Sequence, residues 1–139
     1  MRNVKVLILG LIALVVSSFT SVEKGGEKTV KVTVAWEFKN IVEGYDHNSK
    51  TELYIDGKLV ATSSEKRESK PNSVSTTTTK GRHDIKVINY AEYEGTWEAH
   101  TIANNYSIDC TYEENINLNK KNNNIRLVFD VDSGTKRIK

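Results

Sequence analysis

Apolar and polar residues alternate strictly in two stretches of the chain. The first runs from residue 30 to residue 39, and the second from residue 125 to residue 132. Their apolar members are Val30, Val32, Val34, Trp36 and Phe38 in the first stretch and Ile125, Leu127, Phe129 and Val131 in the second. Because successive side chains of a strand point to opposite faces, the alternation predicts two strands with one buried face each. It also places Trp36 in the core.

Weaker strand patterns fill the interval between these two stretches. Residues 52–61 contain Asp56-Gly57, a pair typical of a two-residue hairpin turn because both central positions need a positive φ. Further strands are predicted over residues 85–90, 106–112 and 116–118, where apolar side chains recur within short segments. Most of the chain is therefore expected to be extended.

Polar segments separate the predicted strands. The tract from Thr62 to Lys80 is interpreted as a loop that Pro71 ends, followed by a candidate edge strand. Residues 119–124 are interpreted as a hairpin loop, and residues 133–139 are expected to fray. No stretch has a sustained helical period. About seven short strands with polar turns between them predict an all-β fold, an antiparallel two-sheet β-sandwich of the immunoglobulin-like kind.

Residues 1–21 have the pattern of a secretory signal peptide. Arg2 and Lys5 precede an apolar run from Val6 to Val16, and small or hydroxylated residues follow it. The run is shorter than the roughly 20 apolar residues of a membrane span, and no Cys follows it as in a lipoprotein. We expect cleavage near residues 18–21, with an uncleaved anchor as the alternative. Residues 22–139 would then be a single β-sandwich domain in the periplasm or outside the cell.

The signal peptide changes the charge of the domain. The chain has 20 Lys and Arg against 18 Asp and Glu, but Arg2 and Lys5 belong to the predicted signal peptide, which leaves 18 of each. A neutral domain with interspersed charges has no broad basic surface, so nucleic-acid binding is not expected. A single Cys cannot close a disulfide, and three His with one Cys do not form a spaced zinc ligand set.

Two segments resemble the signature of a known family. Leu53–Val60 contains a strand, Asp-Gly and a second strand, and Lys80–Val87 contains the spacing G-x-H-x-I-x-V. Over about residues 52–90, the chain resembles small bacterial surface β-sandwiches of the PEGA or immunoglobulin-like kind. The interval between the hairpin and the glycine is longer than in the PEGA pattern and lacks its Thr-Pro step. The resemblance implies a noncatalytic extracytoplasmic module and carries over no functional residues.

Sequence motifs for catalysis and metal binding are missing. There is no G-x-S-x-G, H-E-x-x-H or glycine-rich phosphate loop, so neither enzyme activity nor a cofactor is expected. Cys110 and His100 could form a thiolate pair, but Cys110 shares its parity with Ile108, which favours a buried, inert thiol over a reactive or interchain one. Asp130–Gly134 and Tyr45–Asn48 lack the spacing of a calcium loop, so no metal site is predicted.

One segment combines aromatic and acidic side chains. Residues 89–100 hold three aromatics and three acids around Gly95, and Asn104 follows. Flat aromatic faces stack on sugar rings, while carboxylates and amides bind sugar hydroxyls. The predicted ligand-binding residues are Tyr93, Trp97, Glu94, Glu98 and Asn104. In the alternative interpretation, Trp97 plugs the end of the sandwich and the acids are solvated turn residues.

These observations predict a secreted, noncatalytic binding or structural module of the bacterial envelope or cell exterior. Its expected partner is an envelope protein that pairs with an open sheet edge. The alternative is a carbohydrate-binding module that holds an extracellular glycan with the aromatic loop from Tyr90 to Trp97. A hydrolase that uses Glu94 and Glu98 is a third hypothesis, for which the sequence offers no recognisable arrangement.

Overall fold

Ten strands and one short 3₁₀ helix make up residues 26–139, the part of the chain that the computed structural model describes. The predicted signal peptide and its cleavage site lie outside the described residues. In chain order the elements are β1 (Thr29–Lys39), β2 (Asn48–Ile55), β3 (Lys58–Thr62), β4 (Lys66–Arg67), β5 (Asn72–Thr79), β6 (Gly81–Tyr93), β7 (Thr96–Ala99), η1 (Ile102–Asn104), β8 (Thr111–Leu118), β9 (Asn122–Asp130) and β10 (Gly134–Ile138). Within this part of the chain, no helix has the length and apolarity needed to span a membrane.

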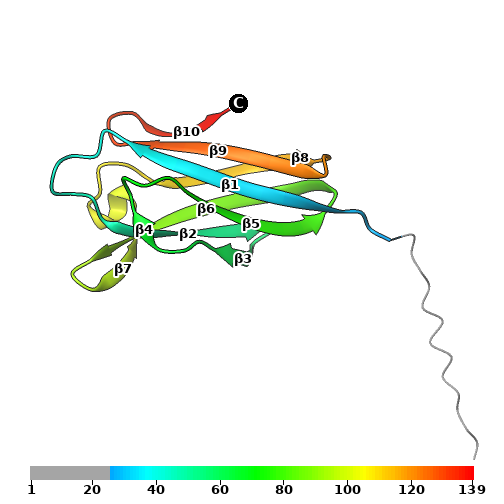
Figure 1. The fold of residues 1–139 in the computed structure, drawn as a ribbon, viewed down its shortest axis with the longest axis horizontal. Helices are drawn as coiled ribbons and strands as arrows, with labels where there is room; N and C mark the ends of the chain where they lie inside the picture. Colours follow the sequence, from blue (N-terminus) through cyan, green and yellow to red (C-terminus); the bar gives the residue numbers. More distant parts are fainter. Residues whose placement is uncertain (1–25) are drawn as a thin grey trace, which may run out of the picture.

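The strands form two sheets packed face to face, which confirms the predicted all-β sandwich. One sheet has four strands in the order β10-β9-β1-β5. The other has six: β3, β2, β6 and β7 in order, with β4 also pairing β2 and β8 also pairing β6. Figure 1 shows β1, β9 and β10 along one side of the molecule and β2 and β3 along the other. The number of strands in residues 26–139 exceeds the predicted seven because short strands such as β4 and β7 extend the sheets locally.

Strand β1 is the centre of the four-stranded sheet and follows the predicted alternation. Val30, Val32, Val34 and Trp36 are buried, and Phe38 packs against the same core. In the neighbouring strand β9, Ile125, Leu127 and Phe129 are buried on the same face of the sheet, as their parity predicts. The edge strand predicted after Pro71 is also confirmed, because β5 pairs with β1 along its whole length and ends the sheet.

Two predictions about the C-terminal part are wrong. Residues 119–124 do not close a hairpin: β8 pairs with β6 in one sheet, whereas β9 pairs with β1 in the other, and in parallel. Residues 119–121 therefore cross between the sheets and residues 122–124 already belong to β9, which alternation within each strand could not reveal. Residues 134–138 do not fray, since they form β10 antiparallel to β9. The fold is thus antiparallel except at the β1–β9 pair.

The predicted Asp-Gly hairpin joins β2 to β3. Asp56 and Gly57 have φ values of 51° and 80°, as a two-residue hairpin turn requires. Asp56 also tethers β6: its Oδ2 lies 2.6 Å from Nδ1 of His83, and its Oδ1 accepts the Asp84 N–H at 2.9 Å. The acid and the histidine of the G-x-H segment are therefore in contact, and they hold one end of the six-stranded sheet.

The inner face of the six-stranded sheet becomes more polar along its length. Leu53 and Ile55 of β2 face Ile85 and Val87 of β6 in the core, but Thr51 and Asn89 follow them as fully buried residues. The strand predicted over residues 106–112 begins only at Thr111, because η1 and an irregular segment precede it. The sandwich is therefore apolar at the Asp56 end and polar at the opposite end.

Candidate functional site

A cavity of about 600 Å³ opens at the polar end of the sandwich. It lies where the β1–β2 loop, the β4–β5 turn, the β6–β7 hairpin and the η1 segment meet. This is the end from which the β6–β7 hairpin projects in Figure 1. The lining residues are Ile41, Val42, Tyr45, His47, Glu68, Tyr93, Glu98, His100, Asn104, Asn105, Tyr106, Ser107 and Val131. We refer to this cavity as the end pocket.

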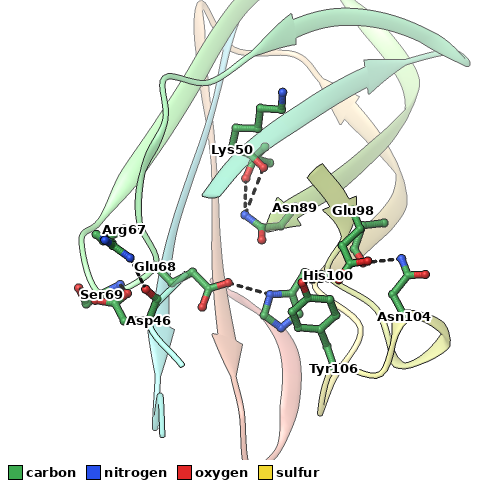
Figure 2. Close-up of polar contacts among 12 residues, drawn as sticks. Asp46, Lys50, Arg67, Glu68, Ser69, Asn89, Glu98, His100, Asn104 and Tyr106 are labelled. Atoms are coloured by element: carbon green, nitrogen blue, oxygen red, sulfur yellow. Dashed lines mark hydrogen bonds and ion pairs between the residues drawn. The ribbon is translucent and has the colours of Figure 1, made fainter. Parts of the chain in front are cut away.

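The floor of the end pocket holds a buried acid–histidine pair. Oε1 of Glu68 lies 2.8 Å from Nδ1 of His100, and the two side chains are only 2% and 6% exposed. Figure 2 marks this contact with a dashed line, and because a carboxylate oxygen accepts, the imidazole Nδ1 is the donor. Because burying a charge without a partner is costly, each residue stabilises the other's position in the fold.

A polar clamp places Glu68 in the pocket. The carboxylate of Asp46 accepts the backbone N–H of Ser69 at 2.9 Å and the Ser69 hydroxyl at 2.7 Å. Arg67 donates to the Asp46 carbonyl at 2.8 Å, and the Glu68 N–H donates to the His47 carbonyl at 2.9 Å. Burial opposes ionisation of Asp46, but the hydrogen bonds from Ser69 prevail and lower its pKa. The turn that carries Glu68 is thereby fixed to the β1–β2 loop.

Backbone hydrogen bonds and aromatic rings fix His100. Its N–H donates to the Asn89 carbonyl at 2.9 Å, and its carbonyl accepts the Cys110 N–H at 2.8 Å. The Tyr106 ring lies against the imidazole with 4.2 Å between centroids, and Phe38 lies on the core side at 5.7 Å. The histidine is therefore held by packing as well as by its carboxylate partner, and its ring has little freedom to turn.

Two polar atoms on the floor remain available. His100 Nε2 and Glu68 Oε2 have no hydrogen bond within residues 26–139, yet the only fully buried side-chain oxygen or nitrogen without a partner in that range is Asn89 Oδ1. The two atoms must therefore retain access to solvent, and since both residues line the end pocket, that access comes from the pocket. A ligand in the pocket would meet one acceptor and one imidazole nitrogen.

Tyrosines and a second glutamate form the walls. Tyr106 donates its hydroxyl to Glu98 Oε1 at 2.9 Å, and burial together with this bond raises the pKa of Tyr106. His47 meets both Tyr93 and Tyr106 edge-on, with centroid distances of 6.3 and 5.6 Å. Tyr93 and Tyr45 also line the end pocket, and both are more than half exposed.

The structure brings together only three of the five residues predicted to bind a ligand. Tyr93, Glu98 and Asn104 line the end pocket, although the Asn104 amide already donates to the Ala99 carbonyl at 2.8 Å. Trp97 lies outside it, because it pairs with Glu92 and faces the opposite side of the hairpin from Tyr93.

The predicted aromatic platform is therefore not formed. Lys50 covers the Trp97 ring instead, with its Nζ 4.3 Å from the ring centroid, and the indole is half-buried. Glu94 is at the exposed hairpin turn, where its φ is 49°. It is distant in register from Glu98, and only Glu98 lines the pocket.

The other candidates have structural explanations. Cys110 is fully buried, as predicted, and burial raises the pKa of its thiol. Asp130 accepts hydrogen bonds from Asn40 at 2.8 Å and from the Asp132 N–H at 3.0 Å, which lower its pKa to about 2. Among the described residues, no three His, Cys, Asp or Glu side chains are placed to hold a metal ion.

Sequence reasoning missed Glu68, His47 and the role of His100. Glu68 lies in a polar tract that was interpreted as a plain loop, and 32 positions separate it from His100. No local pattern marks either residue as a partner of the other. The one usable signal was Tyr106, an aromatic close to the aromatic and acidic loop. Comparison with protein-family models, curated proteins and solved structures finds no match to this chain.

Proposed function

We propose that this protein is a noncatalytic binding module that holds a saccharide in the end pocket. The observation that carries the proposal is the combination of tyrosine walls with carboxylate, amide and imidazole groups in one cavity of about 600 Å³. Ligand sites are typically concave, with apolar walls and a few convergent polar groups, and this volume lies within their usual range. The location in the envelope or outside the cell remains a prediction from residues 1–21.

The walls and the floor suit different parts of a sugar. Tyr93 and Tyr45 are open at the mouth and can stack on the C–H face of a ring. Glu98 and the free oxygen of Glu68 can accept ligand hydroxyls, and hydrogen bonds to a charged acceptor are the stronger kind. His100 Nε2 adds a third polar contact at the floor. A stack with several hydrogen bonds on one side is the arrangement that fixes a hydroxylated ring.

The hydrolase hypothesis loses its specific arrangement of acids. Glu94, its second acid, lies in the exposed turn, whereas Glu98 lines the pocket. Within residues 26–139, no side-chain hydroxyl or thiol is hydrogen-bonded to His100, so no side-chain nucleophile is paired with the imidazole. The function we propose is binding without chemistry.

Two aromatic substitutions on the same hairpin test the saccharide proposal. Tyr93→Ala should weaken binding of a glycan found by array screening about tenfold, because it removes a stacking face. Trp97→Ala is the matched control, since Trp97 lies on the other side of the hairpin, and it should leave affinity within about twofold. Isothermal titration calorimetry measures both variants. An array with no bound glycan, or equal losses in the two variants, would contradict the proposal.

A protein partner at the β5 edge is a second candidate function. Strand β5 ends its sheet and carries no charged residue over its eight positions. Exposed edges without charge are open to pairing with a further strand. If an envelope protein adds a strand here, Thr77→Lys should abolish its recovery in a pull-down, while Thr135→Lys on β10 at the other edge should not.

A further inference from the structure

The lining of the end pocket contains two acids and no residue with a permanent positive charge. Among the described residues, Glu68 and Glu98 line it and no Lys or Arg does, while its two imidazoles are those of His47 and His100. Within residues 26–139, His100 is the only ion-pair partner of Glu68, and the neutral Tyr106 hydroxyl is the only hydrogen-bond partner of the Glu98 carboxylate. An anionic ligand would meet like charge in a partly desolvated site and be rejected.

Buried atoms show that this is a built site rather than a cluster of surface acids. The Glu68 side chain is 2% exposed, and one of its oxygens is bonded while the other opens into the pocket. Tyr106 beside Glu98 supplies no compensating charge, because a phenol is never cationic, and its raised pKa keeps the hydroxyl neutral and donating to Glu98. The same negative field contributes, after burial, to the raised pKa of the Cys110 thiol, for which Glu68 is one cause.

The walls are also suited to a cation. Tyr93 and Tyr45 line the end pocket and are more than half exposed, and cations are attracted to the faces of aromatic rings. Glu98 has a second oxygen with no hydrogen bond among residues 26–139, next to the one that Tyr106 occupies. A cationic group with several N–H donors would form a stronger hydrogen bond to this oxygen than a neutral hydroxyl would.

We infer that the end pocket selects ligands that bear a protonated primary amine, with Glu98 as the direct partner of the ammonium and Glu68 supplying charge behind it. This inference rests on the proposed function and names its ligand class, an amino sugar. The ammonium would compensate the negative charge of the Glu98 carboxylate, while the sugar ring lies against Tyr93.

Four probes of similar size separate charge from sugar recognition. They are glucosamine, N-acetylglucosamine, glucuronate and cyclohexylamine, titrated into the protein at pH 7 by calorimetry. Glucosamine should bind about tenfold more tightly than N-acetylglucosamine, because a charge-assisted bond replaces a neutral one. Glucuronate should not bind, and added salt should reduce the preference for glucosamine.

Glu98→Gln should abolish the preference and retain the fold, because the glutamine oxygen can still accept the Tyr106 hydroxyl. Glu94→Gln is the matched control from the same hairpin, and it should retain the preference. Equal affinity for glucosamine and N-acetylglucosamine, or a preference that survives in Glu98→Gln, would overturn the inference and leave saccharide binding in place.

Two further results separate the two proposals. Binding of cyclohexylamine and glucosamine without binding of N-acetylglucosamine would support the ammonium site and overturn the saccharide proposal. Failure of all four probes to bind would overturn both.

Discussion

The buried pair of Glu68 and His100 should be energetically coupled, and a double-mutant cycle measures the coupling. The three variants are Glu68→Ala, His100→Ala and the double substitution. The two side chains are 2% and 6% exposed and are joined by one bond of 2.8 Å. Each single variant therefore leaves its former partner buried and without its hydrogen bond.

The magnitude follows from the cost of breaking a buried pair, about 3–5 kcal/mol when one member is removed. We take the lower limit, about 3 kcal/mol for each single variant, because one atom of each residue still reaches the pocket. The double variant leaves no unpaired group and should lose about 4 kcal/mol rather than the roughly 6 of two independent losses. The expected coupling is about 2 kcal/mol, and each single variant should lower Tm by about 12 °C.

Urea unfolding monitored by circular dichroism gives the four free energies of unfolding. Glu65→Ala is the matched control: this exposed acid lies three residues before Glu68, and its loss should change stability by less than about 0.5 kcal/mol. Additive losses, with a coupling near zero, would refute the reasoning that burial makes the two residues depend on each other.

Three further predictions concern the opposite end and the core. Asp56 raises the pKa of His83 above its ordinary 6.5, and His83 lowers that of Asp56 below 3.8. The pair therefore stabilises the fold most between pH 3.8 and pH 6.5. Its contribution decreases as pH rises through the His83 pKa or falls through the Asp56 pKa. Thermal melts across this pH range should show the decrease, and Asp56→Asn should remove the pH dependence. Gly57→Ala should cost about 1 kcal/mol because φ is 80°, whereas Gly26→Ala should cost nothing measurable. Cys110 should react with a thiol reagent at least about a hundredfold faster in urea than in the native protein.

Strand positions were the most predictable feature of the fold. Alternation assigns a face to every side chain of a strand, so it identified the buried residues of β1 and most of those of β9 without any tertiary information. The Asp-Gly turn was also predictable, because few residue pairs adopt positive φ at both positions. These signals are local, and each depends on the backbone of a few consecutive residues.

Strand partners and the candidate site were not predictable in the same way. Alternation carries no information about strand pairing, so the crossover at residues 119–121 and the parallel β1–β9 pair emerge only from the packed sheets. The aromatic loop contained Tyr93 and Trp97, but the register of the β6–β7 hairpin placed them on opposite sides. Tyr93 pairs with Thr96, so Trp97 lies one position beyond that pair and points to the other side.

The amino-acid sequence by itself determined that the two alternating segments are extended, which of their faces is apolar and where the Asp-Gly turn lies, because those properties arise from side chains and φ values of neighbouring residues. The tertiary structure alone decided that Glu68, from the β4–β5 turn, meets His100 and Tyr106, from the β7–β8 connection, in one cavity. Their meeting depends on which sheet each flanking strand joins, and that choice is made by the packing of the whole core.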